Sequence, residues 1–162
     1  MTLPRAEKAY EKHAWIILFA IATIFLVFAF TAILFGFGLS AFPVGIPGGP
    51  DATKSLTGRT WDEIVTESPG IVNLIRAISR VFGYALLGFS VFGMALSGLG
   101  YRKGERWTWY VLWYLPAFLT GLAIHEFGGG FLAMPVLLLI VSFLGLFLPY
   151  RKFFPAKNPT PP

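Results

Sequence analysis

The sequence contains no cysteine and few charged residues, and both absences narrow the possible kinds of protein. A chain without cysteine cannot form a disulfide scaffold, a thiolate metal site or a cysteine nucleophile. Charged residues make up only 13% of the chain, about half the share usual in soluble domains, while 56% of the residues are hydrophobic. A soluble fold of this size could not bury so much apolar surface, and a disordered chain would have far less of it. The composition therefore predicts an integral membrane protein.

Known catalytic and ligand-binding motifs are missing as well. The chain has no HExxH, Walker A or dinucleotide-binding motif. Its two histidines, His13 and His125, lie too far apart in sequence to form a two-histidine haem site within one helix pair. No clustered basic face of a soluble domain is present to bind nucleic acid, so we expect no nucleic-acid partner. We also expect no enzymatic activity, no metal and no cofactor.

Four apolar runs without any Asp, Glu, Lys or Arg cover residues 14–39, 81–101, 107–124 and 127–150. A helix needs about 20 apolar residues to cross the hydrocarbon core of a bilayer, with a range of about 17 to 25. The first run is too long for a typical signal peptide, so it should remain as a membrane helix. These runs predict an all-α, antiparallel four-helix bundle in the lipid bilayer. Its single membrane domain, residues 14–150, has spans at about 14–39, 70–101, 107–125 and 128–149.

The basic residues are unevenly distributed among the connections, which predicts the orientation of the chain. Nine of the 13 lie before the first span, between the second and third spans, and after the fourth. The other four lie in or near the first loop, on the opposite side. Cytoplasmic loops are enriched in Lys and Arg, so we expect a multi-pass protein of the cell membrane with both termini in the cytoplasm. Residues 1–13 then form a cytoplasmic N-terminus, and residues 151–162 a flexible cytoplasmic tail.

The outer loop, residues 40–69, begins with a stretch rich in Pro and Gly that excludes regular structure. Thr60 and Glu63 then match a capping box, which predicts a short interfacial helix over residues 61–67. Ser68 and Pro69 predict a second helix start, with Pro at the first helical position. A helix from residue 69 to residue 100 is about 48 Å long, against about 30 Å of hydrocarbon. Its first turns should therefore project beyond the bilayer core, or the helix should tilt or line a wet cavity.

Glycines recur at every fifth position of the second span, at Gly83, Gly88, Gly93 and Gly98. A five-residue step spreads them around the helix, so we expect neighbouring helices on several sides and a central place for this span in the bundle. Pro116 and Pro135 lie inside the third and fourth spans, and we expect them to kink these helices.

A few polar residues near the outer end of the bundle require an explanation. We expect an outer-leaflet cluster there, with Arg80 paired to Glu126 because an unpaired charge at membrane depth is costly. Two interpretations remain open. The structural one, which is favoured near the interface, is an ion pair that fixes helix register or side chains that extend to the headgroups. The functional one is a ligand-binding pocket for a small anion or a lipid headgroup. The cluster comprises Asn73, Arg76, Arg80, His125 and Glu126.

One resemblance covers residues 73–114. The Gly-rich segment NLIRAISRVFGYALLGFSVFG and the basic turn YRKGERWTWY resemble the DoxX-like group of small four-helix membrane proteins. This resemblance implies an up-and-down four-helix bundle. Members of the group mostly have no assigned function, so it implies no catalytic residue.

Two functions are compatible with these features. The first is a non-enzymatic accessory, assembly or oligomerising membrane subunit that binds a protein partner or further copies of itself through faces of the second span. The second is a small-molecule, anion or lipid-headgroup binding or transport protein that uses the outer polar cluster.

Overall fold

A computed structural model describes residues 9–35, 54, 58–125 and 133–155. All regular structure in these ranges is helical, as predicted. The elements in chain order are α1 (Ala9–Phe35), α3 (Trp61–Glu67), α4 (Pro69–Ala95), the π-helix η1 (Leu96–Tyr101), α5 (Arg106–Val111), α6 (Tyr114–His125), α7 (Ala133–Phe147) and α8 (Tyr150–Phe153).

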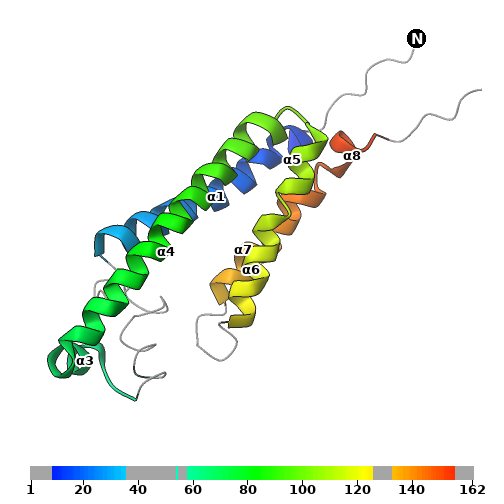
Figure 1. Cartoon of the computed structure of the whole chain (residues 1–162). Coiled ribbons are helices and arrows are strands. Elements are labelled where there is room, and N and C mark those ends of the chain that lie inside the picture. The colour runs from blue at the N-terminus through cyan, green and yellow to red at the C-terminus, as the bar shows by residue number, and fades with distance from the viewer. Residues whose placement is uncertain (1–8, 36–53, 55–57, 126–132, 156–162) are drawn as a thin grey trace, which may run out of the picture.

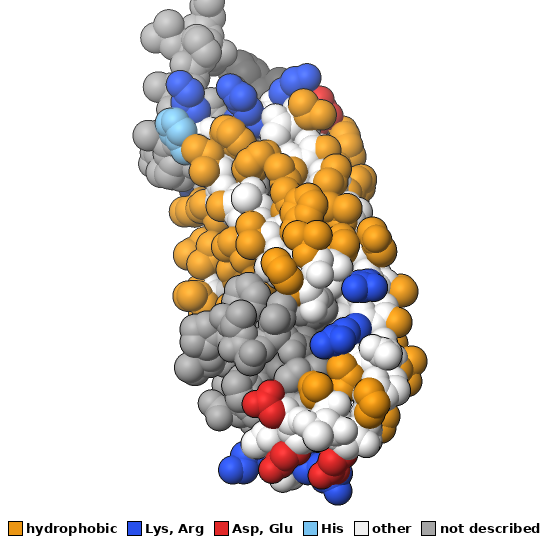
Figure 2. All heavy atoms as spheres, turned by 90° about the vertical axis from the view of Figure 1, so that its left-hand side faces the viewer, with side chains coloured by type: hydrophobic (Ala, Val, Ile, Leu, Met, Phe, Trp, Pro, Cys, Tyr) orange, Lys and Arg blue, Asp and Glu red, His pale blue; other side chains and the backbone are white. Residues whose placement is uncertain are grey.

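Four helical segments are long and apolar enough to cross a membrane, which confirms the predicted fold class. They run over Glu11–Phe35, Pro69–Tyr101, Arg106–Ile124 and Ala133–Phe153. The short helix α3 precedes the second of them and occupies the predicted residues 61–67. Figure 2 shows hydrophobic side chains over most of the upper half of the visible face, charged side chains at its two ends, and two basic groups near mid-height. This distribution suits a protein whose middle is surrounded by lipid.

Helices α1 and α4 form the most extensively packed pair, and they run antiparallel (Figure 1). A Cβ atom on Gly83 would lie 3.1 Å from the Ala29 carbonyl oxygen, and one on Gly93 would lie 3.2 Å from the Ala22 Cβ. These glycines let the two helix backbones approach closely. In a bilayer, close approach strengthens the van der Waals packing that holds helices together.

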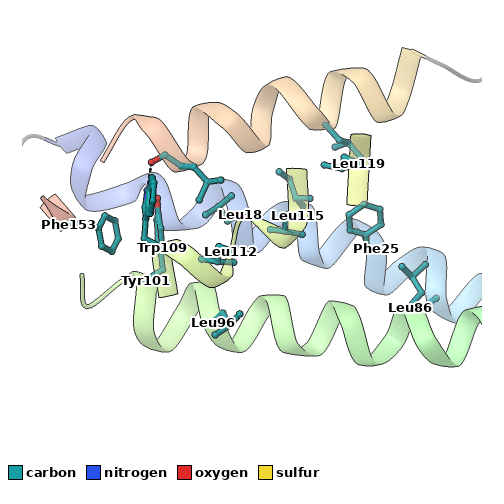
Figure 3. Close-up of a cluster of buried hydrophobic side chains, with 14 residues drawn as sticks. Leu18, Phe25, Leu86, Leu96, Tyr101, Trp109, Leu112, Leu115, Leu119 and Phe153 are labelled. Carbon is teal, nitrogen blue, oxygen red and sulfur yellow. Dashed lines mark hydrogen bonds between the residues drawn. The ribbon is translucent and has the colours of Figure 1, made fainter. Parts of the chain in front are cut away.

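The central helix is α1, so the predicted central place of the second span is wrong. Figure 3 shows α1 between α4 and α7, and α1 packs against both. Gly145 of α7 lies against α1, where an added Cβ would come within 2.9 Å of the Leu18 side chain. On α4, by contrast, no described atom lies within 4 Å of the place where a Gly88 Cβ would be. The glycines of the second span do face different sides, but only some of those sides meet another helix.

The buried core follows α1 and the faces of the helices around it. Leucines from α1, α6 and α7 fill its middle, among them Leu18, Leu119 and Leu146, each fully buried. Phe25 lies edge-on to the rings of Phe89 and Phe118, with centroids 5.7 Å and 5.6 Å away, which joins α1, α4 and α6. Edge-to-face contacts of this kind stabilise aromatic pairs beyond their buried area.

The predicted kink of the third span occurs one turn before Pro116. Proline has no backbone N–H, so the Leu112 carbonyl lacks its usual donor four residues later. That carbonyl instead accepts a hydrogen bond from the Leu115 backbone N–H at 3.1 Å, and a turn at residues 112–113 separates α5 from α6. Pro135 lies in the first turn of α7, where proline is tolerated, and the residues directly before Ala133 lie outside the described ranges.

Helical structure extends beyond the predicted membrane domain at both its N-terminal and its C-terminal limit. Helix α1 begins at Ala9, within the predicted N-terminal segment 1–13. The predicted tail begins at residue 151, but residues 150–153 form α8, and Phe153 is buried against the Tyr101 ring at a centroid distance of 4.6 Å. The burial of the Phe153 side chain explains why the helical structure continues past residue 149, the predicted end of the fourth span. The rest of the tail, residues 156–162, lies outside the described ranges.

Candidate functional site

The outer polar cluster is described only in part. Asn73, Arg76 and Arg80 lie on α4, and all three are exposed. His125 is the last residue of α6, and its side chain is not described, while Glu126 lies outside the described residues. The expected pairing of Arg80 with Glu126 therefore stays a prediction.

The depth of the α4 arginines follows from the length of the second span. This helical segment covers Pro69–Tyr101, 33 residues, and the basic residue Arg102 comes directly after it. If the hydrocarbon boundary lies near Arg102, about 20 residues cross about 30 Å and the other boundary falls near Arg80. Arg76 and Asn73 then lie one and two turns further out, at the level of the headgroups. Arginines at this depth can interact with phosphate groups or water without crossing hydrocarbon.

The end of the bundle that carries α3 is charged and locally well ordered by hydrogen bonds. The Glu63 backbone N–H donates to the Thr60 hydroxyl at 3.3 Å, and the Thr60 backbone N–H donates to the Glu63 carboxylate at 2.7 Å. This is the predicted capping box. The hydrogen bonds from the Thr60 backbone and then from its side chain lower the pKa of Glu63. Arg59 and Glu67 form an ion pair beside it, so this end exposes both signs of charge.

The start of α4 follows the prediction in one respect and differs in another. Pro69 is the first helical residue, as predicted. Ser68 stands at the N-cap position, but its side chain makes no capping hydrogen bond. Its backbone carbonyl instead accepts hydrogen bonds from the N–H groups of Ile71 and Val72 at 3.0 Å and 3.3 Å.

At the opposite end, two aromatic side chains complete the hydrogen bonding of α7. Pro149 has no N–H, so it cannot bond the Gly145 carbonyl four residues earlier. The Tyr101 hydroxyl donates to this carbonyl at 2.7 Å. The Trp109 indole N–H donates to the neighbouring Leu146 carbonyl at 3.1 Å (Figure 3). In a membrane such carbonyls need a partner, because no water is present to replace the missing donor. Tyr101 and Trp109 therefore hold η1 and α5 against α7.

The sequence pattern alone does not predict this role for Tyr101 and Trp109. Tryptophans and tyrosines clustered around residue 110 are typical of a membrane interface, which fits the exposed Trp107 and Tyr110 but not the buried Trp109. A signal was nevertheless present in Pro149, which lies four residues after Gly145 at the end of an apolar run. It predicts a free carbonyl at Gly145, although it does not predict which donor satisfies it.

The face of α4 that points away from α1 carries a few small residues among large apolar ones, such as Val81, Tyr84 and Val91. Ala77, Gly88 and Ala95 are exposed and are separated by 11 and 7 residues, close to three and two helical turns. The opposite face carries Ser79, Gly83, Leu86, Ser90 and Gly93, all buried. The exposed residues on α1 and α7 are mostly large as well, such as Leu34 and Leu137. Gly88, which has no side chain and faces open space, permits another helix to approach α4 closely at its position.

Within the described ranges, no three His, Asp or Glu side chains come together in a way that could hold a metal ion. Two features of the described residues remain as candidate binding surfaces. One is the exposed face of α4 around Gly88, and the other is the pair of exposed arginines, Arg76 and Arg80. No protein-family model, curated protein or solved structure matches the chain, so the resemblance to DoxX-like proteins stays a prediction.

Proposed function

We propose that this chain is a non-enzymatic subunit of the cell membrane, with an accessory, assembly or oligomerising role, and that α4 provides its interface. The observation that carries the proposal is the division of α4 into two faces that both contain small residues. One face packs on α1, while the other is exposed along the helix.

The exposed glycine Gly88 supports packing of this face against protein in preference to lipid. Many exposed positions of α1, α4 and α7 carry large apolar side chains, which suit contact with lipid. Glycine in a helix interior costs about 1 kcal/mol relative to alanine, so an exposed Gly88 contributes nothing to folding. At a helix–helix interface the same glycine allows backbones to approach, as Gly83 does within the chain. The partner is thus a second membrane helix, from another copy or from another protein.

The orientation belongs to the same proposal. The end that holds α5, α8 and the start of α1 carries most of the basic residues, and we place it in the cytoplasm by the positive-inside rule. The α3 end then faces outward. A partner that binds α4 over its whole length would contact both leaflets.

Single-cysteine cross-linking tests the interface directly, because the natural chain contains no cysteine. Gly88→Cys and Ala95→Cys place a thiol on the exposed α4 face, while Val27→Cys and Leu137→Cys place one at exposed positions of α1 and α7. Each variant is oxidised in native membranes and run on a non-reducing gel. We expect disulfide-linked dimers for the α4 variants and none for the two controls if the partner is a second copy.

A different partner gives a different product. A photo-reactive residue at position 88 would then link the chain to one other protein in constant ratio, with no link from position 27. The proposal is wrong if position 88 yields neither a dimer nor a defined product, or if all four cysteine positions cross-link equally.

A second function is favoured by one observation, the two arginines on the outer part of α4. Arg76 and Arg80 are exposed, one turn apart, and close to the expected hydrocarbon boundary. The alternative proposal is an outer-leaflet pocket for an anion, a lipid headgroup or a small molecule, completed by Asn73, His125 and Glu126. Replacement of both arginines by glutamine should abolish a co-purifying anionic ligand while the protein level stays constant. If no ligand is lost, the arginines serve only as interfacial anchors.

A further inference from the structure

A pocket lined by basic side chains lies at the end of the bundle opposite α3. Lys12, His13 and Trp15 come from α1, Arg102 from the turn after η1, and Lys152 from α8. The pocket has a volume of about 280 Å³, far more than one water molecule needs. Figure 2 shows Lys, Arg and His side chains together at this end of the molecule. Three segments distant in sequence thus meet around one cavity.

The fold holds these side chains in place. The Lys152 ammonium donates to the Arg102 carbonyl oxygen at 3.1 Å, which ties α8 to the turn after η1. The Arg102 guanidinium carbon lies 5.2 Å from the centre of the Trp15 ring, within range of a cation–π interaction. Gly104 has a φ of 80°, and the Lys152 side chain packs beside it, with its Cε 3.1 Å from the position of an added Cβ. Little rearrangement is then needed when a ligand binds.

The charge balance of the pocket favours an anion. Its lining includes three cationic side chains and one histidine, and no acidic side chain. The nearest acidic residues in sequence do not line it. Glu11 is buried and has an interaction partner of its own, and the Glu105 carboxylate accepts a hydrogen bond from the Trp107 indole N–H at 2.6 Å. Lys12 and Arg102 each bring a positive charge to the cavity, and this charge attracts an anion.

The depth of the pocket indicates which anion. Trp15 is partly buried at the start of the first span, and the next residue, Ile16, is an exposed apolar side chain. A ligand in the pocket therefore lies at the level where the first span begins, close to the boundary between headgroups and hydrocarbon. Arginine and lysine are suited to phosphate oxygens, and basic pockets between membrane helices bind phosphate headgroups.

We propose that this pocket binds the phosphate group of an anionic lipid from the adjacent leaflet. Arg102 and Lys12 contact the phosphate oxygens, Lys152 adds positive charge, and Trp15 packs against the glycerol region. A bound lipid of this kind would link α1, α8 and the turn after η1 at the membrane surface. The site is independent of the α4 face and lies at the other end from the α4 arginines.

Native mass spectrometry of the full chain in detergent tests this site with defined lipids. Phosphatidylglycerol is titrated against phosphatidylcholine, which has the same phosphodiester but no net charge, for the natural protein and two double variants. Lys12→Gln with Arg102→Gln removes two charges from the pocket. Lys103→Gln with Arg151→Gln removes two exposed charges from the same end that do not line this pocket. Matching elution profiles and melting temperatures show that both variants fold.

We expect phosphatidylglycerol to bind about thirtyfold more weakly to the pocket variant and within about twofold to the control. Phosphatidylcholine should bind weakly to all three proteins. Inorganic phosphate at millimolar concentration distinguishes the sources of the phosphate group: a lipid site retains its phosphatidylglycerol, whereas displacement identifies free phosphate as the occupant and overturns the lipid assignment. Equal losses in the two double variants, or equal binding of both lipids, would overturn the site.

Discussion

The Tyr101 hydroxyl donates a 2.7 Å hydrogen bond to the Gly145 carbonyl, which Pro149 leaves without its helical donor. This contact joins the end of the second span to the end of the fourth. Together with the bond from Trp109 to Leu146, it closes the basic end of the bundle. It also explains how a proline near the end of a membrane helix is accommodated without an unpaired carbonyl.

A double-mutant cycle between Tyr101 and Pro149 tests this relationship. Tyr101→Phe removes the donor and should lower the free energy of unfolding by about 1 kcal/mol or more. Pro149→Ala restores a backbone N–H that can reach the Gly145 carbonyl, so Tyr101→Phe should cost clearly less in that background. Tyr110→Phe, at an exposed tyrosine of the same region, serves as the control and should have almost no effect. Equal costs of Tyr101→Phe in both backgrounds would mean that the hydroxyl does not replace the missing donor.

The two faces of α4 predict opposite results for two glycines five residues apart. Gly83→Leu places a side chain against Ile33 and the Ala29 carbonyl, so the α1–α4 pair should be destabilised by about 1–3 kcal/mol. Gly88→Leu meets open space within the described chain and should leave the melting temperature of the monomer in detergent unchanged or higher. Thermal unfolding of both variants in detergent measures this difference. A monomer destabilised equally by both substitutions would show that the Gly88 face packs within the chain.

Acidification should loosen α3 before the rest of the bundle. The Thr60 hydrogen bonds lower the pKa of Glu63, so its carboxylate stabilises the cap above the ordinary pKa of 4.5. This contribution is lost as the pH falls through the lowered pKa, and it does not change between pH 6 and pH 8. Amide exchange in α3, measured by mass spectrometry and corrected for intrinsic rates, should therefore speed up only below about pH 4.5. Glu63→Gln should remove this dependence, and a natural chain that shows none would contradict the role of the carboxylate.

The proposed orientation is tested with reporters at the C-terminus. Alkaline phosphatase fused after residue 162 should be inactive, since it folds only outside the cytoplasm, and a green fluorescent protein at the same place should be fluorescent. A phosphatase inserted in the outer loop should be active. The reverse pattern would mean that the nine basic residues lie outside and that the positive-inside rule fails for this chain.

The sequence was sufficient for those features that depend on local patterns. Apolar runs identified the four spans, Thr60 and Glu63 identified the cap of α3, and Pro69 identified the start of α4. Each of these is decided by neighbours within a few residues in the chain. The first part of the outer loop carries no comparable pattern beyond its Pro and Gly content.

Features that depend on contacts between segments distant in the chain could not be predicted from these local patterns. The five-residue spacing of the glycines shows that they face different sides, but it cannot show that α1 covers Gly83 and leaves Gly88 exposed. The basic pocket was not predicted either, because Lys12, Arg102 and Lys152 belong to three separate basic segments whose only common property in the sequence is their side of the membrane. Their meeting depends on α8, which lies where a flexible tail was predicted.

The central claim is that the exposed face of α4 binds another membrane helix, and the mass of the complex in native lipid tests it most directly. The natural protein and Gly88→Leu are extracted with their surrounding lipids by a polymer and measured by mass photometry or native mass spectrometry. We expect one defined assembly larger than a single chain for the natural protein, and a large shift to the single chain for Gly88→Leu. A natural protein that is already a single chain in native lipid, or an assembly that Gly88→Leu leaves intact, would contradict the claim.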